Sequence, residues 1–152
     1  MKLNYKLFLL LLPFIAFACK KESVDQAAID REIIRKYIAD NSINADSTDS
    51  GLFYAISDSG TAPNPTATSA VLVYYKGYFT DGVRFDSNNP GLPREFSLAG
   101  VIKGWQEGIP KIGKNGKIKL MIPSALGYGA SEFGSIPANS VLIFDIELDS
   151  FR

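Results

Sequence analysis

One short stretch with helical periodicity, residues 102–112, lies between segments whose residues favour β-strands. Its apolar side chains recur at the spacing of one helix face, and they are Ile102, Trp105, Ile109 and Ile112. Trp105 is the only tryptophan, and so large an apolar side chain can fill a core or form the floor of a pocket. The spacing alone leaves both interpretations open.

The segments around this helix predict an antiparallel sheet. Branched, aromatic and alternating apolar residues mark strands at 52–56, 71–79, 117–122 and 141–148. An Asp81-Gly82 turn joins the second strand to a run that ends at Phe85-Asp86-Ser87, as in a hairpin. Loops rich in turn residues are expected at 60–69, 88–93 and 124–138. We therefore expect an α+β fold in which a curved antiparallel β-sheet (a half barrel) wraps around one short central helix.

A second helix is predicted before this domain. Ser23 and Gln26 have the spacing of a capping box, and an apolar stripe follows at Ile29, Ile33, Ile34, Tyr37 and Ile38. The charged residues Asp30, Arg31, Glu32, Arg35 and Lys36 are expected on the opposite side. This amphipathic helix should pack on the domain or on a partner subunit. A place on a membrane surface is disfavoured because its charges are mixed rather than basic. A polar linker is expected at 44–50.

The N-terminus has the features of an export signal. Lys2 and Lys6 precede an apolar run at 7–17, which is too short to span a bilayer and has the length of a signal-peptide core. The run ends before Cys19 and resembles a bacterial lipoprotein signal, although Phe17 is bulky for its place. We expect lipidation of Cys19 and attachment to a membrane; the alternative is an ordinary secretory peptide with an incidental cysteine.

These features divide the chain into three parts. A lipoprotein signal peptide occupies 1–18, a lipidated N-terminus with the helix and linker occupies 19–50, and one domain occupies 51–152. The predicted location is the cell envelope, with the protein held at a membrane.

The composition excludes several classes of chemistry. Lys plus Arg and Asp plus Glu both total 16, so the chain lacks the basic surface that nucleic-acid binding needs. The chain contains no histidine and one cysteine, which excludes His-dependent nucleophilic catalysis and His- or thiolate-based metal sites. We expect neither a metal nor a cofactor.

Residues 71–148 carry a series of short motifs in a fixed order. The motifs are Tyr75-Lys76-Gly77, Asp81-Gly82, Phe85-Asp86-Ser87, Val101-Ile102-Lys103-Gly104-Trp105, Glu107-Gly108, Ile122-Pro123, Leu126-Gly127-Tyr128-Gly129, Ile136-Pro137 and Phe144-Asp145-Ile146-Glu147-Leu148. This series resembles the FKBP-type peptidyl-prolyl cis-trans isomerases, the macrolide-binding immunophilins. With its signal and helix, the chain is similar to lipoprotein members from Bacteroidetes-type bacteria, some of which are linked to gliding motility.

The resemblance implies an apolar pocket between the sheet and the helix. Trp105 would be its floor, with Asp86, Tyr128 and Phe85 as the other catalytic residues. The substrate-binding residues would be Tyr75, Phe85, Val101, Ile102, Trp105, Tyr128, Ile136 and Phe144. The backbone N–H of Ile102 and the Tyr128 hydroxyl would donate to the substrate, and Asp86 would point its carboxylate at the imide.

The implied function is isomerisation of Xaa-Pro bonds during the folding of exported or envelope proteins. Proline-containing polypeptides would be the substrates, and macrolide inhibitors would be further ligands. The alternatives are a proline-peptide binding module, or a scaffold lipoprotein of a surface or motility apparatus, with incidental activity. Arg94 stands where the family commonly has an aromatic residue on the pocket rim. It would either pair with Asp86 or weaken the apolar rim and macrolide binding.

Overall fold

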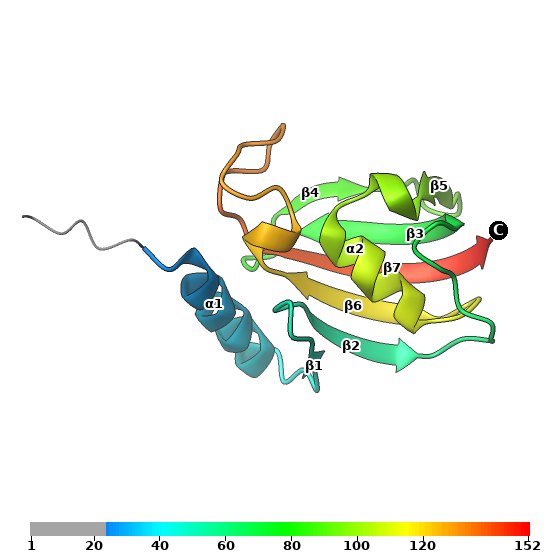
Figure 1. Ribbon diagram of the computed structural model, residues 1–152, viewed down its shortest axis with the longest axis horizontal. Coiled ribbons are helices and arrows are strands. Elements are labelled where there is room, and N and C mark those ends of the chain that lie inside the picture. Colours follow the sequence, from blue (N-terminus) through cyan, green and yellow to red (C-terminus); the bar gives the residue numbers. More distant parts are fainter. Residues whose placement is uncertain (1–23) are drawn as a thin grey trace, which may run out of the picture.

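The computed structural model describes residues 24–152 (Figure 1). Its helices and strands are, in order, α1 (Gln26–Asp40), β1 (Asp46–Ser47), β2 (Phe53–Asp58), β3 (Ala70–Tyr78), β4 (Arg84–Ser87), β5 (Arg94–Ser97), α2 (Lys103–Gly108), β6 (Lys117–Ile122) and β7 (Leu142–Phe151). Three 3₁₀ turns are η1 (Leu98–Gly100), η2 (Ile109–Lys111) and η3 (Ser124–Leu126).

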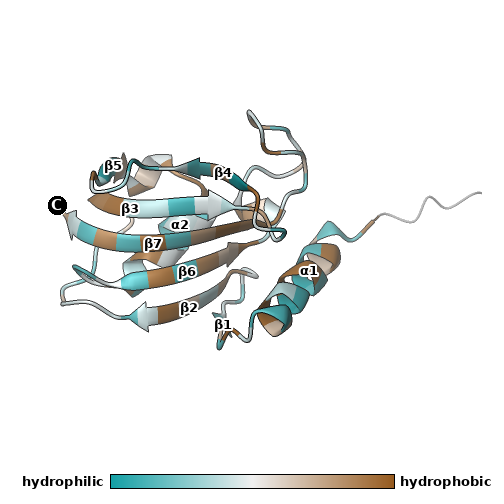
Figure 2. Ribbon diagram, turned by 180° about the vertical axis from the view of Figure 1, so that it is seen from behind, coloured by the Kyte–Doolittle hydropathy of each residue, from teal (hydrophilic) through white to brown (hydrophobic). Residues whose placement is uncertain are grey.

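The strands form one curved antiparallel sheet that packs on α2. The order is β1-β2-β6-β7-β3-β4, and β5 also pairs with β3. The helix lies against one face only, so Figure 2 shows the opposite, outer face with α2 behind it. The predicted α+β fold is confirmed, with α2 as the short central helix and α1 preceding the sheet.

The main core lies between α2 and the inner face of the sheet. Alternation in β6 and β7 points every second side chain at α2, and these side chains include Ile118, Leu120, Ile122, Leu142, Phe144, Ile146 and Leu148. Gly104 and Gly108 let the helix approach β6, because a Cβ at either glycine would lie within 2.6 Å of Ile122 or Leu120 side-chain atoms. The position of α2 on the inner face is thus fixed by the close packing of its backbone against β6.

The predicted strands are confirmed, and two further strands were not predicted. β6 has the predicted limits, and Pro123 follows its last residue. β7 extends to Phe151 because its end pairs with Val71 of β3. The polar segment predicted as a linker contains β1, which pairs with β2, and the mixed sequence after Pro93 forms β5.

The N-terminal helix α1 is present and packs on the domain through Ile34, Tyr37 and Ile38 of the predicted apolar stripe, but the first part of that stripe is exposed. Ile34 is fully buried, whereas Ile29 and Ile33 are 43% and 38% exposed. Asp30, which was predicted to face solvent, is fully buried because its carboxylate bonds to Ser124. The predicted Ser23 cap is also wrong, since Asp25 is the N-cap and accepts from the Ala28 N–H at 3.1 Å.

Helix α1 covers one end of the outer face. Ile34 packs there with Met121, Val141 and Ile143 in a second, smaller core cluster. This contact explains why Val141 and Ile143 are apolar although they share the outer face of β7 with Asp145. The rest of that face was predicted to meet water, and Asp145 and Glu147 are indeed only partly buried.

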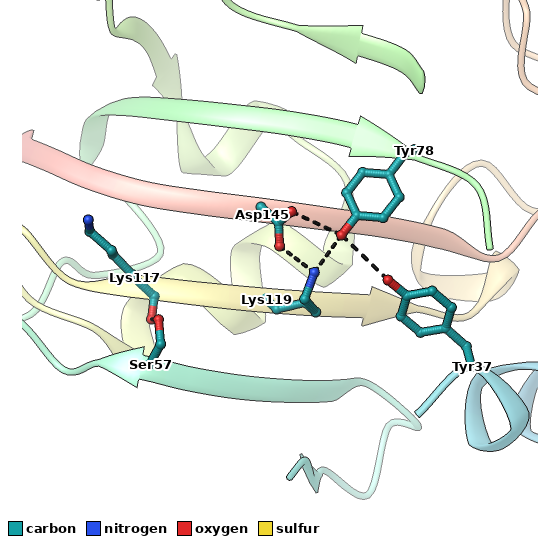
Figure 3. A network of polar contacts seen from close by, with 6 residues as sticks. All are labelled: Tyr37, Ser57, Tyr78, Lys117, Lys119 and Asp145. Atoms are coloured by element: carbon teal, nitrogen blue, oxygen red, sulfur yellow. Dashed lines mark hydrogen bonds and ion pairs between the residues drawn. The ribbon is translucent and has the colours of Figure 1, made fainter. Parts of the chain in front are cut away.

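A polar network joins α1 to the same face (Figure 3). The Tyr78 hydroxyl donates to Asp145 at 2.9 Å and accepts from the Lys119 ammonium group. Lys119 also pairs with Asp145, and the Tyr37 hydroxyl of α1 lies 3.5 Å from that of Tyr78. Burial raises the pKa of Tyr78 well above its usual value, and the charge of Asp145 adds to this effect.

The predicted signal peptide and Cys19 lie outside the described residues. Within residues 24–152, no helix has both the length and the apolar character needed to cross a bilayer.

Candidate active site

Trp105 lies at the centre of a cluster of aromatic rings on the inner face of the sheet. Its side chain is 3% exposed, and three rings meet it edge to face. The ring centroids of Tyr75, Phe96 and Phe144 lie 5.3, 5.3 and 5.2 Å from that of Trp105, at interplanar angles of 79°, 77° and 84°. Edge-to-face pairs at this distance are favourable, so the indole plane is held on three sides.

Phe85 extends this wall from β4. Its ring lies 5.5 Å from Phe144 and 5.0 Å from Phe79. Both Phe85 and Phe144 lie directly against Gly77, where a Cβ would approach their ring carbons to 2.6 and 2.7 Å. A glycine at this position therefore lets two aromatic side chains pack directly against the strand.

The indole N–H of Trp105 is buried and finds no hydrogen-bond acceptor among residues 24–152. Leaving a buried donor unpaired costs about 1–3 kcal/mol. A phenylalanine in this place would avoid the cost but would present a smaller surface. The arrangement fits a site that needs a wide, flat apolar floor.

A polar group borders the aromatic wall at Tyr75. The Tyr75 hydroxyl donates to the carboxylate of Asp86 at 2.9 Å, and it accepts from the Arg94 guanidinium at 3.4 Å. Burial raises the pKa of Tyr75, and the neighbouring Asp86 carboxylate acts in the same direction. Tyr75 therefore remains a hydrogen-bond donor that orients Asp86.

Of the two alternatives predicted for Arg94, the ion pair with Asp86 does not form within the part of the chain that the structure describes. Its guanidinium lies 4.9 Å from the ring centroid of Phe96, as in a cation–π contact, and reaches Tyr75 instead. The two charged groups are connected only through the Tyr75 hydroxyl.

Tyr128 lies in the loop between β6 and β7 and is half-buried. Burial raises the pKa of Tyr128, and the negative charge of nearby Asp86 raises it further. The hydroxyl is therefore protonated at neutral pH and can donate. The Tyr128 ring stacks on Phe133, which is 58% exposed, with a centroid distance of 4.3 Å and an interplanar angle of 5°.

The segment before α2 borders the same cluster of rings. Val101 and Ile102 are partly buried against the same core cluster as Trp105. The Gln106 side chain donates to the Val101 carbonyl at 2.7 Å and holds this segment in place. The Ile102 carbonyl caps α2 by accepting from Trp105, while its own N–H makes no hydrogen bond to any of the described residues.

Ile136 lies in the same long loop as Tyr128 and is 6% exposed. Paired backbone hydrogen bonds of 2.9 Å with Phe133 form the tight turn that carries it. Its side chain belongs to the core cluster that contains Trp105 and Phe144. The predicted apolar and aromatic site residues thus lie in, or pack against, one cluster around Trp105, and Asp86 is joined to it by the Tyr75 hydroxyl.

Sequence reasoning missed Phe96, whose ring contacts both Trp105 and Tyr75. The sequence comparison singled out Arg94 instead, because it stands where the family commonly has an aromatic residue on the pocket rim. The alternation of the Arg94-Glu95-Phe96 segment, once read as a strand, puts Arg94 and Phe96 on the same side. That pattern was the available signal.

A hollow of the described chain lies elsewhere, on the outer face of the sheet. It has a volume of about 940 Å³ and is lined in part by the ion pairs Lys117–Glu147 and Lys119–Asp145. Of the rings around Trp105 and of the predicted site residues, its lining includes only Tyr75. We therefore place the candidate site on the inner face.

The described residues contain no cluster of three or more His, Cys, Asp or Glu side chains suited to a metal.

Comparison with known proteins gives a consistent result. A family model described as FKBP-type peptidyl-prolyl cis-trans isomerase matches residues 62–149. The FKBP-type peptidyl-prolyl cis-trans isomerase FkpA of Escherichia coli (strain K12) is 41% identical over 130 residues, covering 85% of this chain and 47% of the relative. The FkpA protein of Aeromonas hydrophila is 42% identical over 132 residues, covering 84% and 49%. The chain thus spans about half the length of these curated relatives.

Solved structures agree in fold. The crystal structure of FkpA from Escherichia coli superposes with a TM-score of 0.75 at 38% identity, covering 87% of this chain and 62% of that chain. The 1.6 Å structure of a peptidyl-prolyl cis-trans isomerase from Pseudomonas syringae pv. tomato superposes with a TM-score of 0.69 at 30% identity. That match covers 82% of this chain and 95% of the other.

Proposed function

Because the chain belongs to the family of FKBP-type peptidyl-prolyl cis-trans isomerases, we propose that the pocket over Trp105 binds a prolyl ring and accelerates rotation about the Xaa-Pro bond. The observation that carries this proposal is the enclosed ring cluster of Tyr75, Phe85, Phe96 and Phe144 around Trp105. A flat, apolar floor with aromatic walls matches the apolar character of a proline ring.

The chemistry needs no nucleophile, since no covalent bond breaks. The barrier to peptide rotation is about 18–20 kcal/mol and arises from the partial double-bond character of C–N. Uncatalysed exchange of Xaa-Pro bonds takes about tens to hundreds of seconds. An apolar pocket disfavours the polar planar amide relative to the twisted transition state, so each 1.36 kcal/mol or so of differential binding gives about tenfold in rate.

Two free donors support this mechanism at the edge of the pocket. The Ile102 N–H and the protonated Tyr128 hydroxyl can each bond a substrate carbonyl. Asp86, held by Tyr75, presents its carboxylate toward the same region, where it would favour the twisted imide electrostatically. In this proposal Trp105 and Phe85 supply surface, and Asp86 and Tyr128 supply polarity.

The test is protease-coupled isomerisation of a Leu-Pro or Phe-Pro peptide by the full chain. Asp86→Val and Tyr128→Phe should each lower kcat/KM by about tenfold, the effect of losing one hydrogen bond to a charged or reacting group. Asp81→Val is the matched control, because Asp81 caps the neighbouring turn by accepting from the Val83 N–H. If isomerisation with the unsubstituted protein were no faster than the uncatalysed reaction, the proposed enzymatic function would be contradicted.

A proline-peptide binding module is the second candidate, and the pocket rim favours it. Arg94 is exposed there, and the stacked Phe133 offers an apolar surface beside Tyr128. Retained binding of a proline peptide without acceleration would identify this function. Retained cellular function in an inactive Asp86→Val variant would likewise favour binding or scaffolding over turnover.

We further propose that the protein acts in the cell envelope as a lipoprotein anchored at Cys19. The support is the charged start, the short apolar run and the single cysteine at its end. Proline-containing segments of exported proteins would then be the substrates. Cys19→Ala should release the protein from membranes and abolish incorporation of labelled palmitate, with Cys19→Ser as a second variant. Continued membrane association of both variants would contradict the anchor.

A further inference from the structure

Asp30 is a buried carboxylate that the proposed mechanism does not use. It lies on α1, is fully buried, and has no cationic partner among residues 24–152. One carboxylate oxygen accepts from Gln26 Nε2 at 2.7 Å. The other accepts from both the backbone N–H and the hydroxyl of Ser124, at 2.8 and 2.6 Å. A buried charge is costly unless such bonds hold it, so Asp30 and Ser124 are tightly coupled.

Ser124 in turn holds the backbone on both sides of Tyr128. Its carbonyl accepts from the Gly127 N–H at 2.9 Å and from the Gly129 N–H at 2.8 Å. The Gly129 carbonyl accepts from Asn139 at 2.8 Å, which closes the base of the loop. The peptide units that flank Tyr128 are therefore hydrogen-bonded to Ser124, which is itself held by Asp30.

Helix α1 also contacts the strands that enter and leave this loop. Ile34 packs against Met121 near the end of β6, and against Val141 and Ile143 at the start of β7. In Figure 1 the start of α1 lies beside η3, at the base of the loop. One helix thus fixes both ends of the segment that carries Tyr128 and Ile136.

We propose that Asp30 is a positioning residue of the active site. Through Ser124 it sets the backbone around Tyr128, so α1 is a working part of the isomerase and not a spacer before it. The proposal deepens the proposed function and rests on it for its kinetic consequence. The link from Asp30 to the loop can be measured without any turnover.

The experiment combines kinetics and backbone NMR on the full chain. Asp30→Ala leaves the buried Ser124 N–H without its acceptor, and we expect kcat/KM to fall about tenfold, because small misplacements of catalytic groups are costly. The amide resonances of Gly127 and Gly129 should shift in the same variant. Asp30→Asn keeps an acceptor oxygen, and the Gln26 amide can turn to match it, so kcat/KM should stay within about twofold.

Ser124→Ala provides an independent variant, because it keeps the backbone bond to Asp30 and loses only the hydroxyl bond. We expect a loss of about threefold in kcat/KM. The Asp30→Ala/Ser124→Ala double variant should be no slower than Asp30→Ala, since both changes act on one link. If Asp30→Ala does not fold, Ser124→Ala and its glycine resonances carry the test.

Two controls separate positioning from general stability. Asp40→Ala removes an exposed acid that pairs with Lys36 on the same helix, and it should change neither readout. Ile112→Val destabilises a fully buried site away from the loop and should lower the melting temperature without shifting Gly127 or Gly129. Unshifted glycine resonances, or unchanged kcat/KM, in Asp30→Ala would overturn the proposal. If the protein without any substitution showed no isomerase activity, the proposed function would be refuted. The glycine resonances would then still show whether Asp30 positions the loop.

Discussion

The hydroxyl of Tyr75 donates a 2.9 Å hydrogen bond to the carboxylate of Asp86 on the adjacent strand. The ring of the same tyrosine meets Trp105 edge to face and is only 4% exposed. One side chain therefore belongs to the aromatic cluster around Trp105 and orients the polar group beside it. The ring contact with Trp105 and the hydrogen bond to Asp86 can therefore be separated by removing a single oxygen atom.

Tyr75→Phe should lower kcat/KM by about fivefold, the effect of one hydrogen bond, with little change in unfolding free energy. Stability should persist because Asp86 is exposed, so water can replace the lost donor. Tyr74→Phe is the matched control, since Tyr74 lines the hollow of the outer face. Isomerase assays and urea unfolding of both variants make the comparison; equal kcat/KM for the two would count against an orienting role of Tyr75.

The raised pKa of Tyr128 predicts an alkaline-tolerant enzyme. The group keeps its proton in the folded protein at pH values where a free tyrosine, with a pKa of 10.0, begins to lose it. Donation by Tyr128 should therefore persist at pH values where a free tyrosine is losing its proton, and it should be lost as the pH rises through the higher folded value. We expect kcat/KM to be flat from neutral pH to about pH 9, with any decline shifted above that of a free tyrosine. A decline that begins well below pH 10 and is absent in Tyr128→Phe would refute this assignment.

Gly77→Ala should destabilise the protein and distort the pocket together. The added methyl would meet Phe85 and Phe144 at less than 3 Å, so both rings must move. Overpacking of this kind costs about 1–3 kcal/mol. Gly100→Ala is the control, because nothing lies within 4 Å of a Cβ there. Thermal unfolding should separate the two variants, and equal melting temperatures would show that the rings can yield.

Arg94 should limit the affinity of the pocket for apolar macrolides. Arg94→Leu replaces an exposed cation with an apolar side chain, and we expect the Kd of a macrolide to fall about fivefold, the effect of burying one or two more methylene groups. Trp105 is the only tryptophan, so its fluorescence reports binding directly. Arg84→Leu, on the outer face, should leave the Kd unchanged. Weaker binding by Arg94→Leu would mean that the guanidinium contributes to the site.

The sequence predicted strands best where side-chain alternation and a stop signal agree. β6 was predicted to the residue because Lys117 to Ile122 mostly alternates and Pro123 cannot continue the strand. β5 was missed because four mixed residues between a proline and a 3₁₀ turn carry too little pattern to recognise. Phe96 was missed with it, since its place beside Trp105 depends on the pairing of β5 with β3.

The environment of α1 could not be predicted from its own residues. Helical periodicity put Asp30 among charged neighbours, and an aspartate on a helix is usually solvated. Its burial depends on Ser124, 94 positions away, whose N–H and hydroxyl supply the missing donors. The same holds for Arg94, where a shared partner in Tyr75 replaced the expected ion pair with Asp86. Such contacts are properties of the assembled fold.

The docking of α1 makes the two ends of the folded domain unequal. The chain enters the domain next to Ser124 and the Tyr128 loop, whereas Arg152 lies at the opposite end of the sheet (Figure 1). A label, bead or fusion partner attached at the C-terminus should stay far from the Tyr128 loop. The same group attached just before Val24 would stand beside that loop. A tether at the N-terminal side would accordingly dictate from which direction a client polypeptide can arrive.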